Sequence, residues 1–192
     1  DSWTKINTGL TYGSVSSLAI APSGHIFTGT YGGVFRSEDN GNSWTKVNTG
    51  LTKTDVNTLA INQSGHIFAG TRYGGVFRSE DNGNSWTQLN SGLANTNVIS
   101  LAINSSGHIF AGTGGGGVYR STDNGNSWTQ VHSGSDWGQI NYLAINQSGH
   151  IFAATGGLEG GLYRSEDNGN SWTQVNTGWT NQSIWPLAIN TS

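Results

Sequence analysis

Three carboxylates could carry acid–base chemistry, because they lie away from the chain terminus and outside a phrase that recurs through the sequence: Asp55, Asp136 and Glu159. Two carboxylates on either side of a glycosidic bond can hydrolyse it, one as the acid and the other as base or nucleophile. Asp136 and Glu159 fall on loops of the same repeat, so such a pair is geometrically conceivable. The alternative, which we favour, is that these residues are solvated loop charges, since exposed acidic side chains commonly have no partner.

The histidines and the remaining polar residues do not form a recognisable catalytic or metal-binding arrangement. Only His132 is unrepeated, and it replaces an Asn; the others share one repeat position, namely His25, His66, His108 and His150. Copies on separate repeats should lie far apart, so we expect turn and strand-edge roles for them. The sequence contains no Cys, and it lacks a Ser-His-Asp arrangement, a phosphate loop and a nucleotide fingerprint. We therefore expect no metal and no cofactor.

Composition excludes two classes of partner. The formal net charge is −3 without a run of Lys or Arg, so the basic stripe that a nucleic-acid partner requires is absent. No apolar run approaches the ~18 residues of a membrane-spanning helix. Gly accounts for 30 of 192 residues and charged residues for only 10%, which favours short strands joined by tight turns. A Cys-free chain rich in Gly, Asn, Ser and Thr leads us to expect a secreted or cell-surface protein of bacterial origin.

Internal repetition organises the chain. Copies of the phrase SEDNGNSW or STDNGNSW end at tryptophans spaced 42, 42 and 44 residues apart, and Trp3 lies 41 residues before the first of them. Each unit reads as four strands, for example VNTLAIN, HIFAGT, GVFRS and SWTQLN. The last two flank an Asn-Gly pair, the strongest short signal for a hairpin turn. A period in the low forties with four strands predicts a β-propeller.

The predicted fold class is therefore all-β, a β-propeller of four-stranded antiparallel blades, with four complete blades plus split strands of a fifth. The chain forms a single domain over residues 1–192, or a fragment of a longer propeller array. It opens with a fourth strand (2–7) and ends with a first strand (184–190), so the fifth blade lacks its two middle strands. Three resolutions stay open: truncation of a longer array, association through the open terminal strands, or closure as four blades with overhanging ends. We favour a truncated or assembled five-blade arrangement.

The phrase S-x-D-x-G-x-x-W resembles the Asp-box, or bacterial neuraminidase, repeat family. The four full copies are Ser37, Asp39, Gly41 and Trp44; Ser79, Asp81, Gly83 and Trp86; Ser121, Asp123, Gly125 and Trp128; and Ser165, Asp167, Gly169 and Trp172. The resemblance implies a propeller whose boxes are structural turns, with the Asp carboxylate accepting turn N–H groups. A calcium loop is the alternative, but the later bidentate Glu of such a loop is missing.

The resemblance does not extend to sialidase catalysis. A sialidase should present three Arg residues for its substrate carboxylate and a Tyr–Glu nucleophile pair. Here only Arg72 lies outside the repeat position that the other arginines share, namely Arg36, Arg78, Arg120 and Arg164. We expect these four to pair with box carboxylates or to cover strand edges. The family that the chain resembles also includes lectins, receptors and xyloglucan hydrolases, so the fold alone does not define the activity.

The copies differ mainly in the loops between blades and in those between second and third strands, which propeller geometry places on one face. Aromatic side chains beside polar ones are typical of surfaces that bind sugars or protein loops. The candidate ligand-binding residues are Tyr12, Tyr31, Asp55, Arg72, Tyr73, Asp136, Trp137, Glu159, Trp179 and Trp185, with Tyr142 near the channel. Neutral drift in tolerant loops would give similar variation; the unrepeated tryptophans favour binding.

Three hypotheses for function follow. The first is a non-enzymatic, secreted recognition module that binds carbohydrate or protein through this variable face. The second is a structural or assembly module of a larger extracellular protein or filament. The third, a glycosidase, has the least support.

Overall fold

The computed structural model describes residues 2–157, 160–176 and 184, and its strands form four antiparallel sheets of four, here called blades one to four in chain order. Blade one contains β1 (Val15–Ile20), β2 (Ile26–Thr30), β3 (Gly33–Ser37) and β4 (Thr45–Lys46). Blade two contains β5 (Val56–Ile61), β6 (Ile67–Thr71), β7 (Gly75–Ser79) and β8 (Thr87–Gln88). Blade three contains β9 (Val98–Ile103), β10 (Ile109–Thr113), β11 (Val118–Ser121) and β12 (Thr129–His132). Blade four contains β13 (Gln139–Ile145), β14 (Ile151–Gly156), β15 (Leu162–Ser165) and β16 (Thr173–Gln174).

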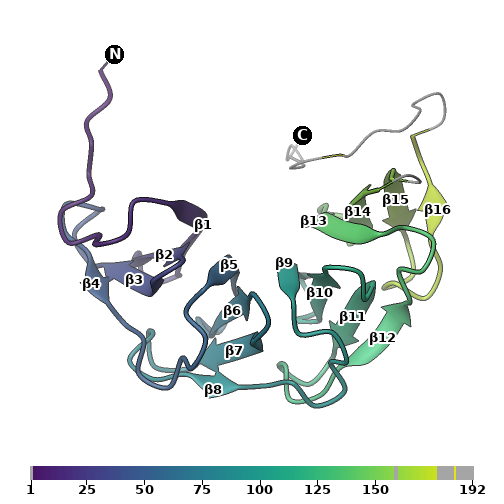
Figure 1. The fold of residues 1–192 in the computed structure, drawn as a ribbon, viewed down its shortest axis with the longest axis horizontal. Coiled ribbons are helices and arrows are strands. Elements are labelled where there is room, and N and C mark those ends of the chain that lie inside the picture. The colour runs from purple at the N-terminus through teal and green to yellow at the C-terminus, as the bar shows by residue number, and fades with distance from the viewer. Residues whose placement is uncertain (1, 158–159, 177–183, 185–192) are drawn as a thin grey trace.

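The blades stand side by side around a common axis, as Figure 1 shows. The first strands, β1, β5, β9 and β13, are innermost and contact one another in that order, while the short fourth strands lie on the outside. Among the described residues, the arc of blades is open between blade one and blade four (Figure 1). The prediction of an all-β propeller with four complete four-stranded blades is confirmed. The part of the chain that the structure describes holds no helix that could cross a membrane.

The box turns join third to fourth strands, and their geometry repeats in all four blades. In blade one, Ser37 Oγ donates to Asp39 Oδ1 at 2.8 Å and accepts from Gly41 N at 2.8 Å. The carboxylate also accepts from the backbone N and the hydroxyl of Ser43, at 2.9 and 2.6 Å. Asn40 adopts a φ of 57°, a left-handed conformation that Asn tolerates better than most residues. The side-chain oxygens of Ser37 and Asp39 are therefore used within the turn, which supports its structural role.

The box turns of blades two, three and four also pack against the preceding blade. The ring of Phe27 is fully buried, and a Cβ built on Gly83 of blade two would lie 3.3 Å from it. Trp86 Nε1 donates to the carbonyl of Val47 at 2.8 Å, which ties the box of blade two to the last strand segment of blade one. Burying a phenylalanine contributes about 1.5–3 kcal/mol. The hydrophobic core of the propeller is thus a series of interfaces between blades.

The arginines before the boxes act across these interfaces. Arg36 pairs with Glu38 at 2.7 Å rather than with the box aspartate, and its Nη1 reaches the carbonyl of Asn82 in the next blade at 2.7 Å. We expected these arginines to pair with box carboxylates or to cover strand edges. Arg36 pairs with Glu38, the residue before the box aspartate Asp39, and not with the aspartate itself.

The terminal segments differ in part from the prediction of split strands. Residues 2–7 do not form a strand, so that expectation is wrong. The carbonyls of Ile6 and Thr8 nevertheless accept from Trp44 Nε1 and N, at 3.0 and 2.9 Å, as those of Val47 and Thr49 accept from Trp86. Of the expected last strand, 184–190, only Ile184 is described, and its carbonyl accepts from Asn141 Nδ2 at 3.1 Å.

Candidate functional site

The exposed aromatic residues of the predicted binding face gather over blades one and two. Tyr12 precedes β1, while Tyr31 and Tyr73 lie in the loops between the second and third strands of their blades. They are 46%, 62% and 64% exposed, respectively. Tyrosine combines a flat apolar ring with a polar end, which suits an exposed contact surface. We call Tyr12, Tyr31, Asp55, Arg72 and Tyr73 the tyrosine face.

Tyr73 is held in a strained backbone conformation. Its φ of 62° lies in the left-handed region, which costs a residue other than Gly roughly 1–2 kcal/mol. The corresponding residue of blade three is Gly115, with a φ of 93°. Blade two therefore carries a large aromatic side chain at a loop position where glycine is free of strain.

Arg72 links the members of the tyrosine face. Its guanidinium carbon lies 5.3 Å from the centroid of the Tyr73 ring, and its Nη1 lies 4.0 Å from Asp55 Oδ2. The side chain of Tyr73, mainly through a hydrogen bond, raises the pKa of Arg72, with smaller contributions from Asp55 and Tyr31. The backbone N of Arg72 also donates to the Asp55 carbonyl at 2.9 Å, which fixes the two loops together. The guanidinium stays charged beside two exposed rings.

Tyr12 packs onto the neighbouring loop. A side chain at Gly32 would overlap its ring, so the glycine allows the ring to lie against the backbone next to Tyr31. Lys46 Nζ lies 5.6 Å from the centroid of the same ring. The result is an exposed surface with two cations, three phenol rings and one carboxylate, which can stack on a sugar ring and donate hydrogen bonds to its hydroxyls.

Trp137 does not belong to this surface, and the expectation that it is an exposed ligand-binding residue is wrong. It is only 5% exposed and stacks between His132 and Tyr163, with centroid distances of 3.5 and 4.0 Å. Leu51 and Leu93, in the preceding loops between blades, are equally buried. The three loops have the same length, and Ser135 aligns with the two leucines, so Trp137 reaches the core from two residues further along the chain.

The remaining predicted site residues are not brought together. Asp136 is exposed beside Trp137, and its Oδ1 accepts only from the neighbouring Ser135, at 2.9 Å. Glu159, Trp179 and Trp185 lie outside the described residues. The conceivable glycosidase pair of Asp136 and Glu159 therefore stays a prediction.

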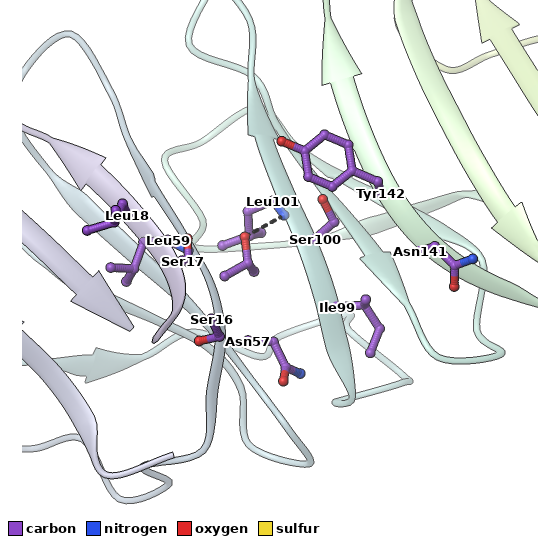
Figure 2. Close-up of a pocket in the computed structure, with 11 residues that line it drawn as sticks. Ser16, Ser17, Leu18, Asn57, Leu59, Ile99, Ser100, Leu101, Asn141 and Tyr142 are labelled. Atoms are coloured by element: carbon purple, nitrogen blue, oxygen red, sulfur yellow. Dashed lines mark hydrogen bonds between the residues drawn. The ribbon is translucent and has the colours of Figure 1, made fainter. Parts of the chain in front are cut away.

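A second concave site lies on the propeller axis, and the sequence indicated only its edge at Tyr142. Figure 2 shows this pocket of about 560 Å³ between the innermost strands β1, β5, β9 and β13. A β-bulge in each first strand turns one extra residue toward the axis, namely Ser16, Asn57, Ile99 and Asn141. Each bulge interrupts the alternation of side chains between the two faces of its strand. A break in that alternation is the feature of the sequence that could have indicated the pocket.

The polar groups of the axial pocket already bind other blades. Ser16 Oγ donates to the carbonyl of Val56, and Asn57 Nδ2 donates to that of Val98 at 2.8 Å. Leu101 N donates to Thr58 Oγ1 at 3.3 Å, the dashed line in Figure 2. These side chains hold neighbouring first strands together, so they offer a ligand less than the tyrosine face does.

The box carboxylates are likewise occupied. Hydrogen bonds from the hydroxyl and backbone N of Ser171, followed by one from Ser165, lower the pKa of Asp167 to about 2. The pKa values of Asp39, Asp81 and Asp123 are lowered by the corresponding serines. Within residues 2–157, 160–176 and 184, no three metal-ligating side chains are grouped.

The sheet topology and the repeated interfaces define a β-propeller. The chain belongs to the family of the DUF6242 beta propeller domain, whose sequence model matches residues 53–184. None of the curated proteins compared with the sequence matches it.

Solved structures with the same fold include two glycoside hydrolases. A GH74 xyloglucanase from Xanthomonas campestris is 21% identical, with a TM-score of 0.72, over 93% of this chain and 32% of the enzyme. A GH74 enzyme from Niastella koreensis is 25% identical, with a TM-score of 0.71, over 92% of this chain and 31% of the enzyme. The chain thus spans about a third of the length of these enzymes. YCF48 bound to D1 peptide is 18% identical, with a TM-score of 0.69, over 88% of this chain and 57% of that protein.

Proposed function

We propose that the chain is a non-enzymatic recognition module that binds carbohydrate through the tyrosine face. The observation that carries the proposal is Tyr73, an exposed aromatic residue kept at a φ of 62° with Arg72 against its ring. Strain at a surface position without a structural benefit is typical of a functional residue. Polypeptide ligands are the alternative partner for the same surface.

A sugar chain fits the chemistry of this surface. Its apolar ring faces would stack on Tyr31 and Tyr73, while Arg72 and Asp55 would exchange hydrogen bonds with its hydroxyls. The likeness to xyloglucanases supports plant-wall glucans as the first ligands to test, and the likeness to a peptide-bound propeller supports the alternative. Several rings spread across two blades favour an extended oligosaccharide over a monosaccharide.

We also propose that the module has no catalytic activity of its own. Each box carboxylate accepts hydrogen bonds from two serines, so it is held as an anion in a structural turn. Asp55 pairs with Arg72, and Asp136 lies in blade four's entry loop. We expect localisation at the surface of, or outside, a bacterial cell, where such polysaccharides are met.

Calorimetric titration with xyloglucan, cellulose and mannan oligosaccharides tests the proposal. We expect Tyr31→Ala and Tyr73→Ala each to weaken binding at least tenfold and Asp136→Ala to leave it unchanged. Absence of binding by the parent chain to every glycan would contradict the carbohydrate form. Hydrolysis of any of these glycans that is lost in Asp136→Asn or Glu159→Gln would contradict the non-enzymatic assignment.

A further inference from the structure

The interfaces between consecutive blades repeat one set of contacts. Arg36 Nη1 donates to Asn82 O at 2.7 Å and to Asn84 Oδ1 at 3.1 Å in the box turn of blade two. Arg78 makes these contacts to blade three and Arg120 to blade four, with distances of 2.6–2.7 Å to the carbonyl and 3.1 Å to the amide. Each blade therefore has an outgoing side, which carries the arginine, and an incoming side, which carries the box asparagines.

Blade four presents an outgoing side that no later blade of the described chain covers. Arg164 keeps its ion pair with Glu166 at 2.7 Å, but its side chain is 39% exposed, against 16% for Arg36 and 15% for Arg78. Phe152 is partly exposed, whereas its counterparts Phe27, Phe68 and Phe110 are fully buried. The residue types match those of the three internal interfaces, so this side is built to receive a blade.

Blade one presents the complementary incoming side. On β1, Val15, Leu18 and Ile20 are 47%, 63% and 69% exposed. The matching residues of blade two, Val56 and Leu59, are 1% and 7% exposed. In blade two, Asn82 O and Asn84 Oδ1 accept from Arg36 of the preceding blade, and the equivalent groups of Asn40 and Asn42 have no such arginine donor among the described residues. An apolar strip and two hydrogen-bonding groups thus remain where the preceding blade packs in the other three copies.

We propose that a second copy of this chain covers these surfaces, with blade four of one copy packing on blade one of the next, head to tail. Arg164 Nη1 would donate to Asn40 O and Asn42 Oδ1 of the second copy, and Phe152 would lie against its Gly41. The apolar strip of β1 becomes buried in the same step. The chain already forms this interface three times between its own blades, and the tyrosine face takes no part in it.

Docking would compete with hydrogen bonds that the terminal segments already make. The carbonyl of Ile6 already accepts from Trp44 Nε1, and that of Ile184 already accepts from Asn141 Nδ2, so docking must replace both. The equivalent carbonyls of Val175 and of Val15 from the other copy can take their place. Tyr142 stands where Ser17 accepts from Leu59 N within the chain, so this interface has one hydrogen bond fewer than the internal ones. Head-to-tail contacts of this kind generate rings or open filaments, depending on whether the rotation closes.

Sedimentation velocity of the 192-residue chain over a wide concentration range tests the proposal, beside the variants Leu18→Asp and Arg164→Ala and the control Tyr31→Ala. The parent and the control should pass from 20.3 kDa to multiples of that mass as concentration rises, and both variants should need at least tenfold higher concentration. Circular dichroism checks that the variants are folded. If Leu18→Asp does not fold, the result for Arg164→Ala decides by itself. A parent chain that stays at 20.3 kDa throughout, or folded variants that associate like the parent, would overturn the proposal.

Discussion

The guanidinium of Arg72 lies over the ring of Tyr73, with Cζ 5.3 Å from the ring centroid. The two residues are consecutive in a loop whose equivalent in blade three consists of glycines. A cation against an aromatic face contributes about 0.5–1 kcal/mol at an exposed site, which offsets part of the strain at Tyr73. This contact holds an exposed phenol ring beside a guanidinium, and the proposed recognition depends on the pair.

Replacing Tyr73 by Gly should separate stability from binding. The change relieves left-handed strain but loses the contact with Arg72 and adds backbone entropy to the unfolded chain, so the free energy of unfolding should change by no more than about 1 kcal/mol. Oligosaccharide binding should weaken at least tenfold. Urea unfolding and calorimetry measure the two effects, and unchanged affinity in this variant would remove Tyr73 from the binding surface.

Trp137 should prove to be a core residue. Trp137→Ala leaves a cavity between His132, Tyr163 and Trp172, and we expect a loss of about 3–5 kcal/mol of unfolding free energy. Trp137→Leu should lose less, because leucine fills part of that cavity. Urea denaturation followed by far-ultraviolet circular dichroism measures both. A loss below about 1 kcal/mol in the alanine variant would mean that the ring does not anchor the loop.

Replacing an arginine that precedes a box should cost more unfolding free energy where a following blade accepts its hydrogen bonds. Arg78→Ala removes contacts to Asn124 and Asn126, and hydrogen bonds from a charged group are worth about 1.5–3 kcal/mol. Arg164→Ala, measured in dilute solution, should cost clearly less, since only its ion pair with the exposed Glu166 is lost. Equal losses in the two variants would show that the contact between blades contributes nothing.

Acid should weaken the propeller through its box turns. The pKa of Asp167 is about 2 in the folded chain, against an ordinary value of 3.8. A lowered folded-state pKa adds stability that is fully present above the ordinary value and is lost as pH falls through the folded value. We therefore expect urea midpoints to fall between roughly pH 4 and pH 2, and to fall less steeply in Asp167→Asn. A midpoint that is constant across this range would contradict the hydrogen-bonded carboxylates.

The sequence predicts the fold well because its information is repeated. Four copies of an Asn-Gly turn and of the phrase ending at Trp44, Trp86, Trp128 and Trp172 fix the strands and the blade boundaries. The exposure of Tyr12, Tyr31 and Tyr73 follows from loops that differ among otherwise similar copies. Features that occur only once in the chain are harder to predict, because they cannot be compared with an equivalent in another blade.

Trp137 and the start of the chain illustrate this limit. In loops of equal length Leu51 aligns with Ser135 and not with Trp137, so the unrepeated tryptophan resembles an exposed loop residue. Residues 2–7 carry the sequence of a fourth strand, but no third strand pairs with them in the described part of the chain, where their hydrogen bond to Trp44 is kept. Pairing partners, which local sequence does not contain, decide whether a strand forms.

The most direct test of carbohydrate recognition is an amide NMR titration of the isotope-labelled chain with a xyloglucan oligosaccharide. Saturable shifts should concentrate in the loops that hold Tyr12, Tyr31, Asp55, Arg72 and Tyr73, while the box turns and the axial pocket stay unchanged. Shifts confined to the axial pocket around Asn57 and Tyr142, or none at saturating oligosaccharide, would contradict recognition through the tyrosine face.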